Sequence, residues 1–176
     1  MNEKTICIIC EKDAEKSGIQ GKNGYFTKCD ICGEYFLASP ELFEGSYTAM
    51  PREKRTMISS YTRDRFEHRE EPPQLEDSDN LKEIITEYEN KTAGVKLKNL
   101  IWYIRKKSPQ FGDSVSLDAE KDYPITYSLS PQGFTEILNN PIGQKLIEPT
   151  ESGFKLTEEG WTLGTELMES KEGSEP

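Results

Sequence analysis

The sequence predicts an α+β fold with a small strand-rich module at the amino terminus and a mixed helical and strand domain at the carboxyl terminus. Short β-branched and aromatic runs surround two pairs of cysteines in the first forty residues. From residue 51 onward, apolar residues recur at helical spacing, and a hairpin signal follows near residue 150. We expect three parts, over residues 1–45, 46–80 and 81–176.

The charge and the apolar content of the chain argue against two classes, nucleic-acid binders and membrane-spanning proteins. The chain has 176 residues and a net charge of −10, from 32 acidic and 22 basic residues. Nucleic-acid binders usually carry excess Lys and Arg, because phosphate contacts supply much of their affinity, so only a local basic patch is compatible with that class. No apolar run is long enough to span a bilayer, and the apolar run at Thr5–Ile9 is too short for a signal peptide. We therefore expect a soluble, cytoplasmic protein.

The four cysteines form two C-x-x-C pairs with 18 residues between them, a spacing typical of a four-cysteine zinc site. Zinc prefers four ligands in a tetrahedron, and two residues between cysteines let a tight turn direct both sulfurs at one ion. Gly33, directly after Cys32, allows the positive φ that such a turn often needs, whereas Glu11 holds the equivalent place after Cys10. The sequence predicts one structural Zn²⁺ ion, with the ligands Cys7, Cys10, Cys29 and Cys32.

Strand-like runs flank both cysteine pairs, at Thr5–Ile6, Tyr25–Thr27 and Glu34–Leu37, and a loop with three glycines is expected over residues 18–24. Two other uses of the cysteines are disfavoured. Disulfides do not suit the expected cytoplasmic location, and a redox pair normally lies in a βαβ setting, which is absent here. A catalytic zinc ion is also disfavoured, because four thiolates leave no position for water.

Residues 5–37 resemble a zinc ribbon, with Cys7-Ile-Ile-Cys10 and Lys28-Cys29-Asp-Ile-Cys32-Gly33 matching its two knuckles. The resemblance implies the metal and the fold but not the function, since zinc ribbons occur in nucleic-acid binders, protein adaptors and enzyme accessory domains. A module of this size cannot be stable through apolar burial alone. In isolated zinc modules the ion contributes about 10–16 kcal/mol.

Pro51 opens a predicted helix that runs to about Glu70, followed by an acidic, Pro-containing linker over residues 71–80. Between Arg52 and Arg69 the helix has six basic and three acidic residues, a local net charge of +3. Either this face binds phosphate or nucleic acid, or its arginines pair with carboxylates on a solvated face; we favour the second. The lone histidine, His68, is expected to be exposed. The candidate anion-binding or nucleic-acid-binding residues are Arg52, Lys54, Arg55, Arg63, Arg65 and Arg69.

The second half begins with a predicted helical region that is capped by Asn80 and ended by Ser108-Pro109. Gly94 either separates two helices there or kinks a single one. Short strands are expected at Ser114–Leu117 and Pro124–Leu129.

Three further elements are predicted toward the carboxyl terminus. Ser130 caps a helix that starts at Pro131 and closes at Pro141. A hairpin follows over Lys145–Thr157, and Thr157 caps a last helix.

The order helix, strand, helix, hairpin, helix over residues 81–169 resembles a winged-helix domain, with Lys145–Thr157 as its wing. Many winged-helix proteins read DNA with the helix before the wing, here about Pro131–Asn140. That segment has no Lys or Arg, and the wing is neutral. This half therefore looks more like an interaction or dimerisation domain.

The whole arrangement is also similar to the N-terminal modules of multidomain bacterial proteins, some of them in antiviral defence systems. The similarity rests on the ribbon, the run Arg-Thr-Met-Ile-Ser-Ser-Tyr-Thr-Arg, the Glu-Pro-Pro that follows, and the winged-helix-like end.

From these features we expect a non-catalytic zinc-binding adaptor or sensor that acts through protein–protein interaction or self-association. The sequence offers no triad, phosphate loop or supported carboxylate pair, so we expect no enzyme and no catalytic residue. The alternative is nucleic-acid binding through the ribbon and the basic helix over residues 52–69.

Overall fold

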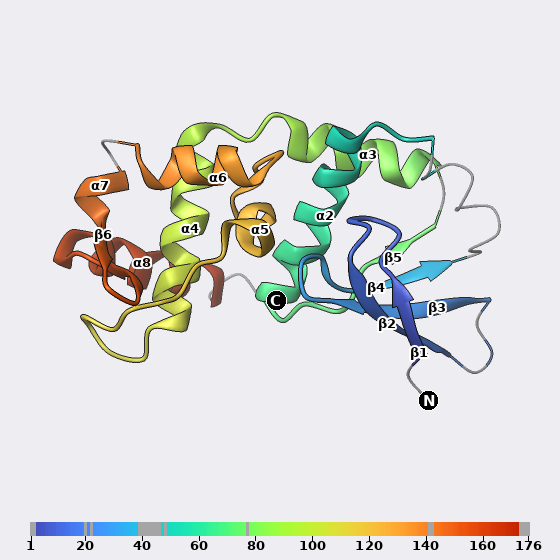
Figure 1. Cartoon of the computed structure of the whole chain (residues 1–176), viewed down its shortest axis with the longest axis horizontal. Coiled ribbons are helices and arrows are strands. Elements are labelled where there is room, and N and C mark those ends of the chain that lie inside the picture. The colour runs from blue at the N-terminus through green and yellow to red at the C-terminus, as the bar shows by residue number, and fades with distance from the viewer. Residues whose placement is uncertain are drawn as a thin grey trace. The chain divides into compact units, whose positions relative to one another are not determined.

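The computed structural model describes residues 3–19, 21, 23–38, 47, 49–76, 78–140 and 143–172, and it confirms the α+β fold. The chain divides into two compact units (Figure 1). Unit 1 consists of Met1–Lys91 and Tyr127–Leu129, and unit 2 of Thr92–Thr126 and Ser130–Pro176.

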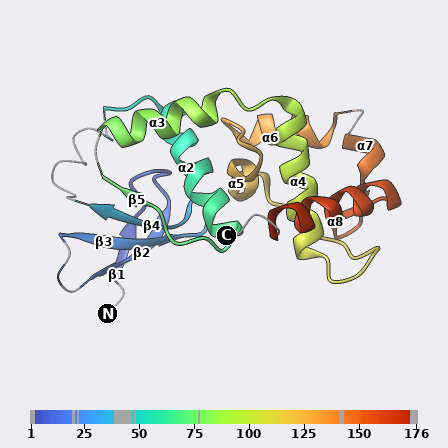
Figure 2. The same cartoon turned by 180° about the vertical axis from the view of Figure 1, so that it is seen from behind.

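Unit 1 is built on a five-stranded sheet with the order β1-β2-β3-β4-β5 (Figures 1 and 2). The first four strands pair antiparallel in chain order, and β5 pairs parallel with β4. Strands β1, β3 and β4 confirm the three predicted strand runs. The strands are β1 Glu3–Ile6, β2 Asp13–Gly18, β3 Gly24–Cys29, β4 Gly33–Ala38 and β5 Gln74–Leu75.

Two of these strands were not predicted. Strand β2 has no β-branched or aromatic residue, and its hydrogen bonds to both neighbours hold it in the sheet. Strand β5 lies within the expected linker, so the linker prediction was wrong at Gln74–Leu75. The Phe36 amide donates a hydrogen bond to the Pro73 carbonyl at 2.9 Å, and the side chain of Leu75 is fully buried. Burial of the Leu75 side chain therefore stabilises the pairing of β5 with the sheet, although the surrounding segment is acidic.

Helices α2 (Arg52–Glu67) and α3 (Ser78–Glu89) complete unit 1. Helix α2, which confirms the helix predicted after Pro51, packs against both β4 and α3 (Figure 1). Helix α3 begins at Ser78, so the prediction that Asn80 caps this helix was wrong. Helix α3 is part of unit 1, whereas the predicted partition assigns residues 81–176 to one domain. The apolar residues buried in unit 1 include Tyr35, Leu37, Ile58, Leu75, Leu81 and Tyr88.

Unit 2 is mainly helical, and its longest helices, α4 and α8, pack against each other (Figure 2). Thr92 caps α4 by accepting a hydrogen bond from the Val95 amide, so the break between α3 and α4 precedes Gly94. A core cluster of Trp102, Tyr103 and Ile125 lies in this unit. Its elements are α4 Ala93–Lys107, α5 Ala119–Asp122, the 3₁₀ helix η1 Tyr123–Thr126, α6 Pro131–Leu138, α7 Gly143–Leu146, β6 Ile147–Thr150, β7 Gly153–Leu156 and α8 Glu158–Glu172.

The predicted hairpin is confirmed over residues 147–156, and so are the caps at Ser130 and Thr157, but the prediction was wrong at Lys145 and Leu146, which belong to helix α7. Strands β6 and β7 pair antiparallel. The Ser130 hydroxyl accepts from the Gly133 amide at 3.2 Å, and the Thr157 hydroxyl accepts from the Gly160 amide at 3.1 Å. A Cβ at Gly160 would lie 2.0 Å from the Leu146 carbonyl oxygen, so only glycine fits at this close approach. The predicted end of α6 at Pro141 lies outside the described residues.

The two other predicted strands of the second half did not form as expected. Of Ser114–Leu117, only Val115 pairs, through two backbone hydrogen bonds of 2.8 and 2.9 Å with Phe154. The prediction of a strand at Pro124–Leu129 was wrong, because Tyr123–Thr126 form η1 and Tyr127 adopts a φ of +52°. Among the described parts of the chain, no helix has the length and apolar character needed to cross a bilayer.

Candidate metal centre

The four cysteines come together at one end of the sheet of unit 1. We call Cys7–Lys12, between β1 and β2, the first knuckle, and Cys29–Gly33, at the turn between β3 and β4, the second knuckle. All four sulfur atoms lie within 4.8 Å of one another. Two of the separations run between the knuckles, with 3.7 Å from the Cys7 sulfur to the Cys32 sulfur and 3.5 Å from the Cys10 sulfur to the Cys29 sulfur. The two turns therefore present their sulfurs to a common point.

These distances fit a tetrahedral metal ion. A Zn–S bond of about 2.3 Å implies sulfur–sulfur distances of about 3.8 Å in a regular tetrahedron. The observed distances of 3.5 and 3.7 Å are close to that value. They are far longer than the bond of about 2.05 Å in a disulfide, and all four cysteines are free thiols. The cluster is thus compatible with structural metal binding.

Each knuckle closes with a residue in the left-handed region. Gly33 has a φ of +76°, as the sequence predicted, and Glu11 adopts +60° at the equivalent place in the first knuckle. A Cβ at Gly33 would lie 2.5 Å from the Cβ of Phe66, so a side chain here would displace α2. The first knuckle is closed by hydrogen bonds from the Cys7 amide to the Lys12 carbonyl at 2.7 Å and from the Glu11 amide to the Cys7 carbonyl at 2.8 Å.

Two buried hydroxyl groups lie against the sulfurs. The Tyr35 hydroxyl, from β4, is 3.3 Å from the Cys7 sulfur. The Ser59 hydroxyl, from α2, is 3.2 Å from the Cys32 sulfur. Against a thiolate, each hydroxyl is the donor, so the pair disperses part of the negative charge that four thiolates bring to the centre. The metal centre therefore includes a helix as well as the two knuckles.

Arginines of α2 hold both knuckles from outside the sulfur cluster. The Arg63 guanidinium donates to the carbonyls of Asp30 and Ile31, at 2.5 and 3.1 Å, and to the Glu67 carboxylate at 2.9 Å. Arg63 is only 6% exposed, so its charge lies inside the protein. Arg55 donates to the Glu11 carboxylate of the first knuckle and holds the pKa of that carboxyl below its usual value. Helix α2 thus contacts both knuckles.

The cysteine thiols also shift one another's pKa values. The hydrogen bond between Cys10 and Cys29 lowers the pKa of Cys29, and the same bond raises the pKa of Cys10. Burial raises the pKa of Cys32, and burial together with the charge on Cys7 raises the pKa of Tyr35. Four thiolates this close repel one another unless a cation balances them. This electrostatic demand is a further reason why the donor set suits a divalent ion.

The six predicted anion-binding residues do not share one environment. Arg63 is buried and Arg55 pairs with Glu11, as described above. Arg65 lies 2.7 Å from the Glu70 carboxylate and 5.2 Å from the centre of the Tyr61 ring. The three whose side chains are exposed are Arg52, Lys54 and Arg69. At 1.5 Å per helical residue, the first two lie roughly 25 Å from Arg69 along the helix axis. A role of this set in nucleic-acid binding stays a prediction.

A second polar cluster, also in unit 1, lies on α2 around Asp64. Its carboxylate accepts hydrogen bonds from the hydroxyls of Tyr88 at 3.1 Å and Tyr127 at 3.0 Å. Burial raises the pKa of both tyrosines, and the Asp64 charge adds to the effect. The prediction that His68 is exposed was wrong, because its side chain is 10% exposed and its Nδ1 lies 2.7 Å from the Asp64 carbonyl oxygen. These contacts join α2, α3 and the segment Tyr127–Leu129 within unit 1.

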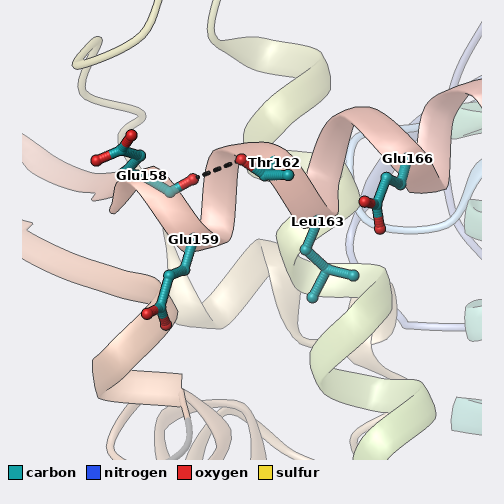
Figure 3. Close-up of a pocket in the computed structure, with 5 residues that line it drawn as sticks. All are labelled: Glu158, Glu159, Thr162, Leu163 and Glu166. Atoms are coloured by element: carbon teal, nitrogen blue, oxygen red, sulfur yellow. Dashed lines mark hydrogen bonds between the residues drawn. The ribbon is translucent and has the colours of Figure 1, made fainter.

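A shallow groove of about 430 Å³ runs along α8 in unit 2 (Figure 3). Glu159, Leu163 and Glu166 project from the same side of the helix, as their spacing of four and three residues requires. Thr162 donates a hydrogen bond to the Glu158 carbonyl at 3.0 Å. The lining consists of three glutamates, one leucine and Thr162, whose hydroxyl bonds to its own helix, and it contains no histidine, cysteine or basic residue, so the metal centre is the stronger candidate site.

Sequence reasoning found the four cysteines but not the groups that support them. Tyr35 appeared only as part of a strand, and nothing in the sequence marks Ser59 as a neighbour of Cys32. Arg63 and Glu67 are four residues apart, so the i,i+4 rule offered a signal for their ion pair. Comparison of the chain with protein-family models, with curated proteins and with solved structures gives no match.

Proposed function

We propose that the chain is a non-catalytic zinc-binding adaptor, in which one structural Zn²⁺ ion held by Cys7, Cys10, Cys29 and Cys32 organises unit 1. The observation that carries this proposal is the convergence of the four sulfurs within 4.8 Å of one another. The antiparallel strands on either side of each knuckle support the resemblance to a zinc ribbon. When bound, the ion supplies a four-way cross-link between the two turns and no chemistry.

The donor set supports the non-catalytic part of this proposal. Four thiolates saturate a tetrahedral ion and leave no position for water or substrate. Two of the sulfurs, on Cys7 and Cys32, are fully buried, which keeps solvent from that side of the centre. The groups around them are hydroxyls and an arginine that bind sulfur or backbone, not groups poised to move a proton.

Unit 2 supports an interaction role rather than DNA reading. The hairpin between α6 and α8, with Val115 pairing against β7, supports the part of the winged-helix resemblance that concerns the wing. Helix α6, in the place of a recognition helix, has no basic residue. Lys155, a basic residue of the wing, forms an ion pair with Glu148 at 3.1 Å, so part of the wing's positive charge is already balanced. We propose that this unit contacts a protein partner or a second copy of the chain.

The experiment combines metal analysis with a test of association. We expect one zinc per chain after expression in zinc-replete medium, and a dimer or a captured protein partner in light scattering and pull-down. A chain that holds zinc but stays strictly monomeric and captures nothing would refute the adaptor role alone. A folded chain without metal would refute the zinc site.

Nucleic-acid binding is distinguished by a gel shift at low and moderate salt. If it occurs, replacing the exposed residues Arg52, Lys54 and Arg69 by Ala will weaken the shift and flatten its salt dependence. Replacing the paired Arg65 is the control. We expect no shift at low salt, since the exposed bases are spread along the helix.

A further inference from the structure

The four thiolates of the metal centre differ in how well the protein shields them. Cys7 and Cys32 are fully buried, and Cys29 is 4% exposed. Cys10, in contrast, is only half-buried. Electrophiles dissolved in water therefore reach one edge of the centre, in the first knuckle, before they reach any other ligand.

The buried pair is also protected chemically. The Tyr35 hydroxyl donates to Cys7 and the Ser59 hydroxyl to Cys32. A donated hydrogen bond draws negative charge from a thiolate and weakens it as a nucleophile. Cys10 instead faces the sulfur of Cys29 at 3.5 Å. The cluster is thus divided into a buried, hydroxyl-bonded pair and an outer pair in which one member contacts solvent.

We propose that Cys10 is a modification site, the ligand through which hydrogen peroxide attacks the metal centre, and that oxidation joins it to Cys29. This inference rests on the zinc site of the proposed function and gives it a regulatory consequence. The ligand set of unit 1 is intact in reducing conditions and is lost when peroxide accumulates.

The step balances as a two-electron oxidation. The Cys10 sulfur attacks one peroxide oxygen, the O–O bond breaks, and the leaving hydroxide takes a proton to become water. The Cys29 thiolate then attacks the Cys10 sulfenic acid, forms the S–S bond and displaces a second hydroxide, which is also protonated to water. The two sulfurs are 3.5 Å apart, so they must approach by about 1.5 Å to reach disulfide bond length.

The product has a defined connectivity. The disulfide links the first knuckle to the second, and Cys7 and Cys32 stay reduced. Because two of the four ligands are consumed, one zinc ion is released for each peroxide molecule reduced. A dithiol reductant together with zinc restores the original ligand set.

The test uses the full chain, with its zinc content measured first. Brief treatment with a small amount of N-ethylmaleimide, followed by digestion and mass spectrometry, gives the order in which the cysteines react. We expect Cys10 to be labelled at least about tenfold faster than Cys7 or Cys32, because of its exposure and lack of hydroxyl shielding. One equivalent of hydrogen peroxide is expected to release zinc and to give a Cys10–Cys29 disulfide.

The variant Ser59→Ala keeps all four ligands and removes one hydroxyl donor. We expect it to raise the labelling rate of Cys32 while Cys10 still reacts first. Equal labelling of the four cysteines, or a peroxide-induced disulfide within one knuckle, in a zinc-loaded protein would overturn this inference and leave the zinc site standing. Absence of zinc before any treatment would overturn both.

Discussion

Units 1 and 2 both bury apolar side chains, but only unit 1 also has a cluster of four cysteines among the described residues. In unit 1, strand β1 has no buried residue and β2 has one, and the elements converge on four sulfurs and the groups that hold them. In unit 2, aliphatic and aromatic side chains of α4 and α6 fill the interior, and Leu100, Ile104 and Phe134 are fully buried. All four cysteines belong to unit 1 and both tryptophans to unit 2. Loss of metal should therefore damage one unit and spare the other, and tryptophan fluorescence reports the spared one.

The largest effect is expected from the loss of a ligand. Cys32→Ser removes a fully buried sulfur that no solvent group can replace. We expect zinc binding to fail and unit 1 to unfold, since the ion contributes about 10–16 kcal/mol in comparable modules. Metal analysis and tyrosine circular dichroism measure the loss. The control, Lys12→Ser, changes an exposed side chain at the end of the first knuckle, and this variant should keep its zinc.

Arg63→Met tests whether α2 is part of the metal centre. The change removes the buried ion pair of Arg63 with Glu67 and the two hydrogen bonds from Arg63 to carbonyls of the second knuckle. We expect unit 1 to lose about 3–5 kcal/mol, the usual cost of breaking a buried ion pair. Denaturant unfolding followed by tyrosine signals checks this. Arg65→Met, in the half-exposed pair with Glu70, should cost about 0–1 kcal/mol, and equal effects of the two would contradict the account.

Phe134→Ala provides the converse experiment in unit 2. Its ring is fully buried, so truncation should cost about 3–5 kcal/mol. The tryptophan unfolding transition should move to lower denaturant while the zinc content stays unchanged. Val95→Ala, at a side chain that is 42% exposed, is the control and should have little effect. A loss of zinc in Phe134→Ala would show that the units are not stabilised separately.

Ser59→Ala sharpens the comparison at the level of a single hydrogen bond. The substitution removes the donor to Cys32, and we expect zinc affinity to fall about 10- to 100-fold, as for other groups that support metal ligands. Competition with a zinc chelator of known affinity gives the value. Ser60→Ala is the matched control, because the neighbouring hydroxyl donates to the Thr56 carbonyl, away from the sulfurs. Equal affinities in the two variants would argue against a role for Ser59.

The smallest effect is expected at a helix cap of unit 2. Ser130→Ala removes the oxygen that accepts from the Gly133 amide at the start of α6. A cost of about 1 kcal/mol is expected, visible in the tryptophan transition and absent from the zinc affinity. The control is Thr135→Ala. The Thr135 hydroxyl donates to the Pro131 carbonyl within α6, so its loss should change stability less. The same cost in both variants would mean that the cap has no special role.

Local signals in the sequence were sufficient where the chemistry is local. The spacing of the cysteines gave the cluster, and Ser130, Thr157 and the hairpin residues gave three element boundaries, because caps and turns depend on neighbouring residues. Strands β2 and β5 were missed because their residues have low strand propensity and only pairing with distant strands holds them. Pro124–Leu129 was misassigned, since its apolar residues suit either a strand or a buried 3₁₀ turn.

In the candidate site, too, local features were predictable and contacts between distant residues were not. Its ligands were predictable, but the contacts of Ser59 with Cys32 and of Arg63 with the second knuckle join residues 27 to 33 positions apart. Such contacts arise from the packing of α2 on β4, which composition and spacing do not specify. A basic residue that reads as a surface charge in the sequence is thus buried in the fold.

Hydrogen exchange of the zinc-loaded chain, before and after addition of a strong chelator, tests the central claim most directly. We predict that chelation removes protection from the amides of β3, β4 and α2, that α4 and α8 keep theirs, and that added zinc restores the original pattern. Unchanged protection of β3 and β4 after complete removal of the metal, or equal loss in both units, would contradict the proposal that a metal–thiolate centre holds unit 1 together.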